Sequence, residues 1–84
     1  MARNYRWVHA TLNQPQTSIL AENCNVIIFR NTGTATVLIN GDPLPVGYSL
    51  TLEGWNDELD LTNYTVQWTT ATGGQVQYWR KFYN

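Results

Sequence analysis

The sequence is poor in the residues that cross-link or chelate. Its 84 residues include one cysteine, one histidine and three prolines, and only 13% of them are charged. Because Cys24 is the single cysteine, an internal disulfide is excluded, and no cluster of cysteine and histidine is present to hold a metal. We therefore expect no metal and no cofactor. A domain of this size has a thin stability margin, which a contact with another subunit would widen.

Charge of one sign, long apolar runs and helical periodicity are also missing. The formal net charge is −1 at pH 7, which argues against binding of nucleic acid through its phosphates. No apolar run approaches the ~20 residues of a membrane-spanning helix. The first residues lack the apolar stretch of a secretory signal. The sequence therefore predicts a protein made in the cytoplasm, with no membrane span and no nucleic-acid partner.

What the sequence does contain is short β-branched and apolar runs separated by turn residues. The Asn40-Gly41 pair favours a type I′ hairpin turn, because both central residues of that turn take positive φ. Pro43 and Pro45 lack backbone N–H groups, so the strand after this turn is predicted to be an edge or to break before Gly47. Leu44 and Val46 are expected in a bend there. The apolar runs of this central stretch cover residues 26–29, 36–39 and 48–52.

Two long segments at the ends of the chain alternate like strands. Residues 5–12 carry apolar side chains on both faces, which predicts a strand covered twice. Residues 75–83 place aromatic rings on both faces as well. Either one face of these strands contacts another subunit, or both strands lie in the middle of a two-layer sandwich. The candidate interface consists of Tyr5, Trp7, Trp79, Phe82 and Tyr83.

The remaining segments fit the same fold class. Residues 63–69 alternate as a half-buried strand, residues 58–62 read as a short edge strand, and residues 18–21 fit either a strand or one helical turn. We predict a single all-β domain over residues 1–84. Its architecture is a small antiparallel β-sandwich or partly open barrel of six to eight short strands.

Catalytic constellations are weak. His9 with Cys24 could make a thiol site, but the turn around Cys24 offers nothing to lower the thiol pKa. Asp57, Glu58 and Asp60 form the one acidic cluster, and they suit a solvated strand face better than paired catalytic carboxylates. The chain is therefore expected not to be an enzyme.

A loop tryptophan supports an alternative function. Trp55 lies outside any alternating pattern, between Gly54 and the polar pair Asn56 and Asp57. A flat ring in a polar loop can stack on a sugar. The segment Trp55, Asn56 and Asp57 is thus a candidate ligand loop of a carbohydrate-binding β-sandwich module.

The pattern of turns and strands resembles small β-rich virion proteins of bacteriophages, which decorate capsids or build spikes, collars and fibre bases. The residues that carry the resemblance are 31–37, 39–41, 44–45, 47–49 and 62–66. The resemblance implies a non-enzymatic structural protein that forms a homo-oligomer. It further implies docking on a major capsid or spike protein and a location in the virion, after synthesis in the host cytoplasm. It assigns no functional residue.

Overall fold

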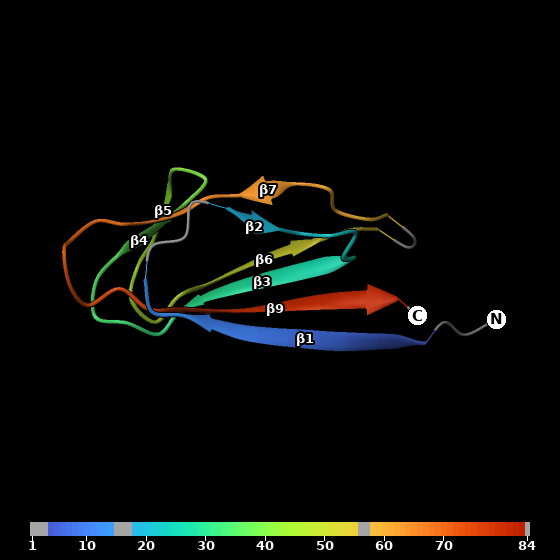
Figure 1. The fold of residues 1–84 in the computed structure, drawn as a ribbon, viewed down its shortest axis with the longest axis horizontal. Coiled ribbons are helices and arrows are strands. Elements are labelled where there is room, and N and C mark those ends of the chain that lie inside the picture. The colour runs from blue at the N-terminus through green and yellow to red at the C-terminus, as the bar shows by residue number, and fades with distance from the viewer. Residues whose placement is uncertain (1–3, 15–17, 56–57, 84) are drawn as a thin grey trace.

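The computed structural model describes residues 4–14, 18–55 and 58–83, and every regular element in them is a β-strand (Figure 1). The strands form a four-stranded antiparallel sheet in the order β1-β9-β3-β6, a three-stranded sheet in the order β5-β4-β8, and the pair β2-β7. Their bounds are β1 (Tyr5–Leu12), β2 (Ile19–Leu20), β3 (Val26–Asn31), β4 (Val37–Ile39), β5 (Asp42–Leu44), β6 (Ser49–Glu53), β7 (Asn63–Tyr64), β8 (Val66–Trp68) and β9 (Val76–Tyr83).

The two smaller sheets lie against one face of the four-stranded sheet, which confirms the predicted small antiparallel β-sandwich (Figure 1). β7 and β8 are separated only by Thr65, so the predicted range of six to eight strands holds if they are counted as one run. The first and last strands are neighbours, with Tyr5 opposite Tyr83. The start of β1 and the end of β9 therefore lie at the same end of a molecule that measures 47 × 18 × 17 Å.

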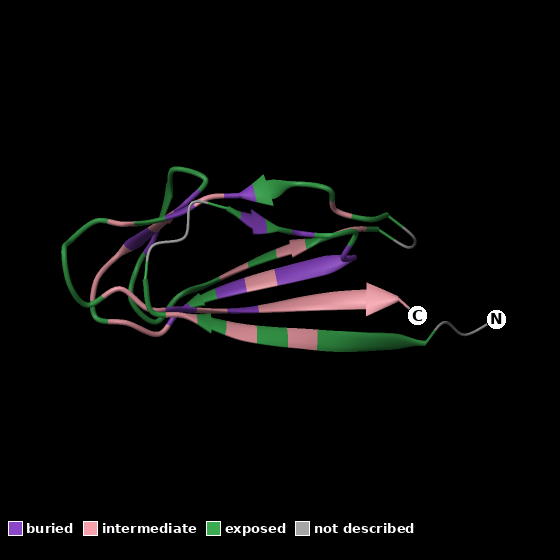
Figure 2. Ribbon diagram, viewed as in Figure 1, coloured by how far each residue is buried: buried purple, intermediate pink, exposed green. Residues whose placement is uncertain are grey.

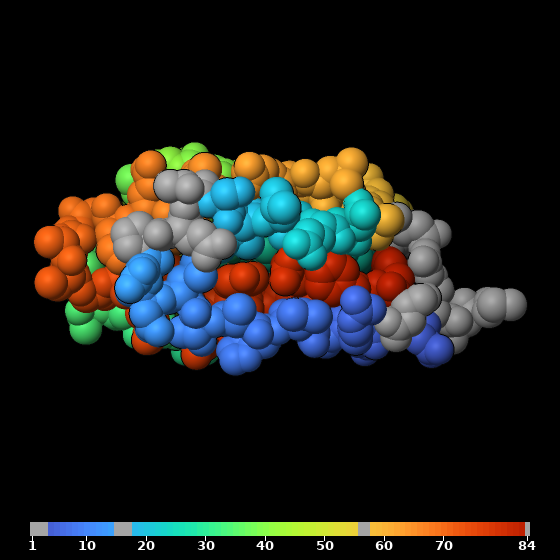
Figure 3. Space-filling view, viewed as in Figure 1, coloured from blue at the N-terminus to red at the C-terminus, as the bar shows by residue number. Residues whose placement is uncertain are grey.

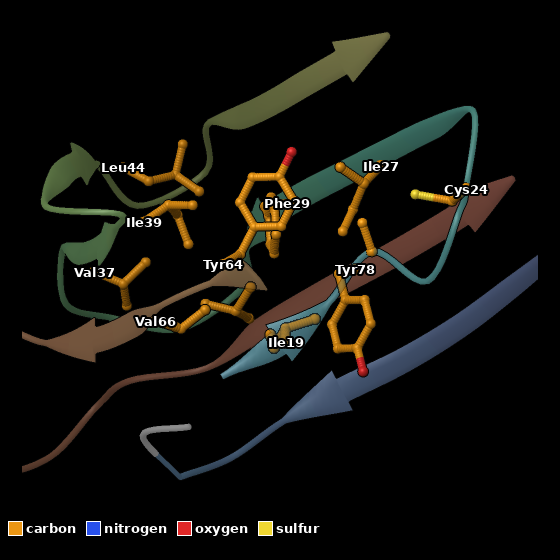
Figure 4. Close-up of a cluster of buried hydrophobic side chains, with 12 residues drawn as sticks. Ile19, Cys24, Ile27, Phe29, Val37, Ile39, Leu44, Tyr64, Val66 and Tyr78 are labelled. Atoms are coloured by element: carbon orange, nitrogen blue, oxygen red, sulfur yellow. The ribbon is translucent and has the colours of Figure 1, made fainter. Parts of the chain in front are cut away.

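The core forms between the layers because successive side chains of a strand point to opposite faces. In β3, Ile27 and Phe29 are fully buried, whereas Arg30 is exposed. Phe29 lies near the centre of the core, with its ring centroid 5.3 Å from that of Tyr64 and 6.2 Å from that of Tyr78 (Figure 4). The buried apolar cluster is Ile19, Ala21, Cys24, Ile27, Phe29, Val37, Ile39, Leu44, Tyr64, Val66, Val76 and Tyr78.

The hairpin turn after β4 confirms the expected turn chemistry. Asn40 has a φ of 50° and Gly41 a φ of 84°, which is the pair of positive values that a type I′ turn requires. β5 is an edge strand, as its proline predicted. However, the bend expected at Leu44 is wrong. Leu44 belongs to β5 and is buried, because Pro43 needs no donor on the edge side and does not interrupt the strand.

Other expectations for local structure are corrected. β1 is an edge strand with its aromatic face exposed, not a strand covered on both faces (Figure 2). The segment 18–21 contains a strand, β2. The edge strand expected at residues 58–62 is reduced to an isolated bridge between Cys24 and Asp60, and Leu61 is 78% exposed. The conformation and exposure of these segments depend on which neighbouring strand covers them, and the alternation of residues within a segment does not specify that neighbour.

A buried asparagine holds the end of β3 to the turns around it. Asn31 is 1% exposed. Its Nδ2 donates to the carbonyl oxygens of Ala35 and Leu44, both at 2.9 Å, and its Oδ1 accepts from the backbone N–H of Gly33 at 3.0 Å. The amide therefore supplies partners to three backbone groups at once. A buried backbone group that loses its partner costs about 1–3 kcal/mol.

We predict that Asn31→Ala destabilises the fold by about 2 kcal/mol or more, because the carbonyl oxygens of Ala35 and Leu44 lose their donor together. The N–H of Gly33 keeps a second acceptor, the carbonyl oxygen of Gln75 at 3.1 Å. Urea unfolding measures the change. Asn4→Ala is the matched control, since Asn4 is exposed and lies outside the strands, and it should change the free energy of unfolding by less than about 0.5 kcal/mol. Equal stability of the two variants would show that Asn31 is not a structural anchor.

Candidate functional site: the outer face of the four-stranded sheet

One face of the four-stranded sheet is turned away from the core, and we call it the outer face. Strand register places its side chains in rows across the sheet, with Trp7 of β1 beside Lys81 of β9, and His9 beside Trp79. The next strand continues the second row, since Ile28 of β3 lies opposite Trp79. The outer face comprises Tyr5, Trp7, His9, Thr11, Gln77, Trp79, Lys81, Tyr83, Val26, Ile28, Arg30, Ser49, Thr51 and Glu53.

Aromatic rings and cations alternate on this face. The rings of His9 and Trp79 stack, with centroids 5.2 Å apart and planes at 26°. The Nζ of Lys81 lies 4.9 Å from the ring centroid of Tyr5 and 5.4 Å from that of Tyr83. Such cation–π contacts hold side chains in place with about 0.5–1 kcal/mol each at exposed sites. The outer face is thus an ordered surface rather than a set of independent side chains.

The face is hollowed where three strands and the edge tryptophan meet. A shallow depression of about 410 Å³ is lined by Trp7, Ile28, Arg30, Ser49 and Trp79. Its lining is mainly apolar, with one guanidinium and one hydroxyl at the margin. This combination of rings with an arginine is typical of contacts between proteins.

The structure brings together four of the five residues of the candidate interface. Tyr5, Trp7, Trp79 and Tyr83 all lie on the outer face. Trp7 is 46% exposed and Tyr5 is 56% exposed. Phe82 lies on the opposite face of β9 and packs against the core, so it does not belong to this surface.

Phe82 is held on the inner side by two arginines. The guanidinium carbon of Arg6 lies 5.1 Å from its ring centroid, and that of Arg80 lies 5.3 Å away. Arg80 also reaches the second layer, where it donates to the carbonyl oxygen of Leu20 at 2.9 Å and lies 3.5 Å from the carboxylate of Glu22. Phe82 therefore contributes to holding the layers together.

Sequence reasoning missed the part of the outer face that comes from β3 and β6. Ile28 and Ser49 belong to the apolar runs 26–29 and 48–52 of the sequence, and neither they nor Arg30 were predicted to form part of an interface. The alternation of 28 and 30 with the apolar residues 27 and 29 was available as a signal. It could not place Ile28 beside Trp79, because that contact depends on the register between β3 and β9.

The candidate ligand loop is only partly described. Trp55 is 75% exposed. Its backbone N–H donates to Oε1 of Glu58 at 2.6 Å, and its carbonyl oxygen accepts from the Glu58 N–H at 2.8 Å. Asn56 and Asp57 lie outside the described residues. The structure thus shows an exposed ring on an anchored turn that lies outside the four strands of the main sheet.

His9 and Cys24, the two residues of the candidate thiol site, do not come together. His9 lies on the outer face, whereas Cys24 is fully buried in the core. Burial, reinforced by the Asp60 carboxylate, raises the pKa of the Cys24 thiol from 9.0 to about 11. A neutral buried thiol is a poor nucleophile.

The acidic residues near Trp55 act as acceptors within the fold. Asp60 accepts hydrogen bonds from the backbone N–H of Thr62 and from the hydroxyl of Tyr64. Burial alone would raise the pKa of Asp60, but hydrogen bonds from Thr62 and Tyr64 outweigh it and hold that pKa below its usual value. Burial, together with the hydrogen bond to Asp60, raises the pKa of Tyr64 to about 12. In the described part of the chain, no three histidine, cysteine or acidic residues gather as metal ligands.

A larger depression of the described residues lies elsewhere. Its volume is about 720 Å³, and amide and hydroxyl side chains from loops form much of its rim. The outer face is the better candidate for binding, because its rings stand on the paired strands β1 and β9, which position side chains more rigidly than loops do. The lining of the larger depression is Asn13, Gln14, Val66, Gln67, Trp68, Thr69, Thr70 and Ala71.

We predict that Cys24 of the folded protein resists thiol reagents. Because its pKa is about 11, the thiolate fraction at pH 8 is about 100-fold below that of an ordinary cysteine, and burial blocks access further. Absorbance with a disulfide reagent should show slow labelling in buffer and immediate labelling in urea. Rapid labelling of the native chain would contradict the buried position of Cys24.

We also predict a loss of stability in alkali. Tyr64 and Cys24 hold their protons more tightly when folded, with pKa values raised from 10.0 to about 12 and from 9.0 to about 11. Their contribution is therefore complete below pH 9 and is lost as the pH rises toward 12. Urea unfolding at pH 8 and pH 10.5 should show a smaller loss in Tyr64→Phe than in the wild type. Tyr48→Phe, which removes an exposed phenol, should behave like the wild type, and an equal loss in all three proteins would exclude Tyr64 as the cause.

None of the described residues belongs to a helix with the length and apolarity needed to cross a membrane. No protein-family model matches the sequence, and no curated protein or solved structure was found to resemble it. The outer face is therefore interpreted from its own geometry.

Proposed function

We propose that this chain is a non-enzymatic structural protein of a virion. In this proposal it self-associates and docks on a major capsid or spike protein, with the outer face as the docking surface. The observation that carries the proposal is the cluster of Trp7, Trp79 and Arg30 around one shallow depression. Tryptophan, tyrosine and arginine are the residues most enriched among those that dominate binding energy between proteins.

The distribution of aromatic rings supports docking. The chain has 11 residues of phenylalanine, tryptophan or tyrosine, of which three, Phe29, Tyr64 and Tyr78, are buried. The second layer covers only one face of the main sheet, so rings on the other face find little cover within the chain. Burying them against another protein removes apolar surface from water at about 25 cal/mol per Å².

Because the sequence resembles small β-rich phage virion proteins, we propose that this docking takes place in a virion. A virion presents many copies of a shell protein, and a small adaptor that binds weakly once per copy gains from repetition. The low net charge of −1 suits such packing, because neighbouring copies repel each other little.

We predict that Trp79→Ala weakens docking at least about 30-fold, which corresponds to the ~2 kcal/mol typical of a central tryptophan. Co-sedimentation with shells assembled from the major capsid protein of the same phage measures the affinity. Trp55→Ala is the matched control, since Trp55 is exposed but lies outside the strands of the main sheet and does not line the depression. Arg30→Ala provides a second variant on the exposed part of the face if the loss of Trp79 unfolds the chain.

The same variants separate the proposal from the carbohydrate-binding alternative. A glycan array signal that depends on Trp55 and not on Trp79 would overturn the docking surface proposed above. Mass spectrometry of purified virions tests the location. Absence of the chain from the particles would refute the virion assignment, whatever the affinity of the outer face for other proteins.

A further inference from the structure

We infer that two copies of this chain pair through their β1 edges, in antiparallel orientation about a two-fold axis at Val8. The partner is thus a second copy of the chain, and the paired sheets form one continuous eight-stranded sheet. This inference deepens the proposed function, since it names the contact by which the copies self-associate. It rests on four observations: the unguarded edge, the direction of its backbone groups, the rings beside it and the small charge.

β1 differs from the other sheet edges. Proteins protect edge strands by keeping them short or by placing proline or charges on them. The edge strands β5 and β8 are three residues long, and β5 contains Pro43. The pair β2-β7 has two residues in each strand, and the edge strand β6 has five residues, of which the last is the charged Glu53. β1 spans eight residues, contains no proline and carries one charged side chain, that of Arg6. Among the described strands it pairs only with β9 (Figure 1), and it forms an open rim of the molecule (Figure 3).

The backbone of β1 directs alternate residues to this open rim. In β9, the carbonyl oxygen of Lys81 accepts from the N–H of Asn25, on the β3 side. Both polar groups of a residue in an antiparallel strand point the same way, so the even-numbered residues of β9 direct theirs toward β1. The residues of β1 opposite them are also even-numbered, and these direct their backbone groups toward β9. The odd-numbered residues of β1 direct theirs away from β9. The N–H and C=O groups directed to the rim are therefore those of Tyr5, Trp7, His9 and Thr11.

These directions restrict the register of a symmetric pair. A rim residue must face a rim residue of the second copy, so the two-fold axis passes through a residue and not between residues. An axis at Val8 pairs seven residues of each strand, from Tyr5 to Thr11. Each opposed pair of rim residues then exchanges two hydrogen bonds. Val8 faces Val8 of the second copy as a non-hydrogen-bonded pair, with its own polar groups used by β9.

The rings favour this register over an axis at His9, and an axis at Trp7 would pair only the five residues of β1 from Tyr5 to His9. With the axis at Val8, Trp7 lies opposite His9 of the second copy. Because His9 already stacks on Trp79 within the chain, the stack extends across the axis to the second Trp7. Cross-strand aromatic pairs contribute roughly 0.2–1 kcal/mol each. An axis at His9 would instead set the two histidines against each other and Trp7 against Thr11.

Charge does not oppose the pairing. Arg6 faces Ala10 of the second copy in this register, so the two arginines stay apart. The net charge of −1 adds little repulsion between copies. The exposed parts of Tyr5 and Trp7 lie along the same rim, so their burial adds apolar area to the backbone hydrogen bonds.

Cysteine cross-linking tests the axis. Opposed residues in a non-hydrogen-bonded pair have Cα atoms about 4.5 Å apart, which suits a disulfide. Val8→Cys should give a covalent dimer on oxidation with diamide, read on a non-reducing gel. Ala10→Cys is the control on the same strand face, because its two copies would lie about 14 Å apart at 3.4 Å per residue. The buried Cys24 thiol leaves the introduced cysteine as the reactive one.

A second pair of variants tests the backbone pairing without a cysteine. Thr11→Pro removes an N–H directed to the β1 rim and should shift sedimentation toward the monomer at least tenfold in concentration. Thr51→Pro is its matched control, since Thr51 is an exposed residue on the opposite edge strand, β6. Equal association of the two variants, or no more cross-linking at Val8→Cys than at Ala10→Cys, would overturn the inference. Loss of shell binding in Trp79→Ala would still support docking in that case, so the two failures are distinguishable.

Discussion

The structure depends on a pleated four-stranded sheet of which only one face is covered by a second layer of strands. Four paired strands must send alternate side chains to opposite sides. The short strands β2, β4, β5, β7 and β8 are enough to cover one side only. The main sheet therefore supplies Ile27 and Phe29 of β3 and Val76 and Tyr78 of β9 to the core, and the second layer supplies most of the rest. Rings in the intervening positions have no place inside, and this division accounts for the exposed aromatic surface.

Polar groups in the interior decide how the layers close at their ends. Asn31 serves three backbone groups where β3 ends. Asn25 is also buried and donates from Nδ2 to the carbonyl oxygen of Glu58 at 2.9 Å. Arg80 spans the layers to reach Leu20 and Glu22. In a core this small, such contacts align turns that apolar packing alone would leave free to shift, since hydrogen bonds are directional.

The same geometry separates the groups that chemistry would need together. His9 stands on the outer face with Trp79, Cys24 is enclosed with a raised pKa, and Asp60 is engaged by Thr62 and Tyr64. The fold does gather aromatic rings on the outer face, beside the β1 edge, where alternate backbone groups point outward. A face and an edge are the two ways in which a sheet binds other proteins. The proposed docking and pairing use one each.

The sequence by itself determined the fold class, the turn at Asn40-Gly41, the edge position of the proline strand and the membership of Tyr5, Trp7, Trp79 and Tyr83 in strands with aromatic faces. These features follow from local rules, namely positive φ, the missing N–H of proline and the two-residue period. Only the tertiary structure decided that β1 is uncovered, that Phe82 packs inward between Arg6 and Arg80, and that Ile28 and Arg30 join the tryptophans. Those facts depend on strand order and register, which arise from contacts between residues far apart in the chain, and alternation within one strand says nothing about its neighbour.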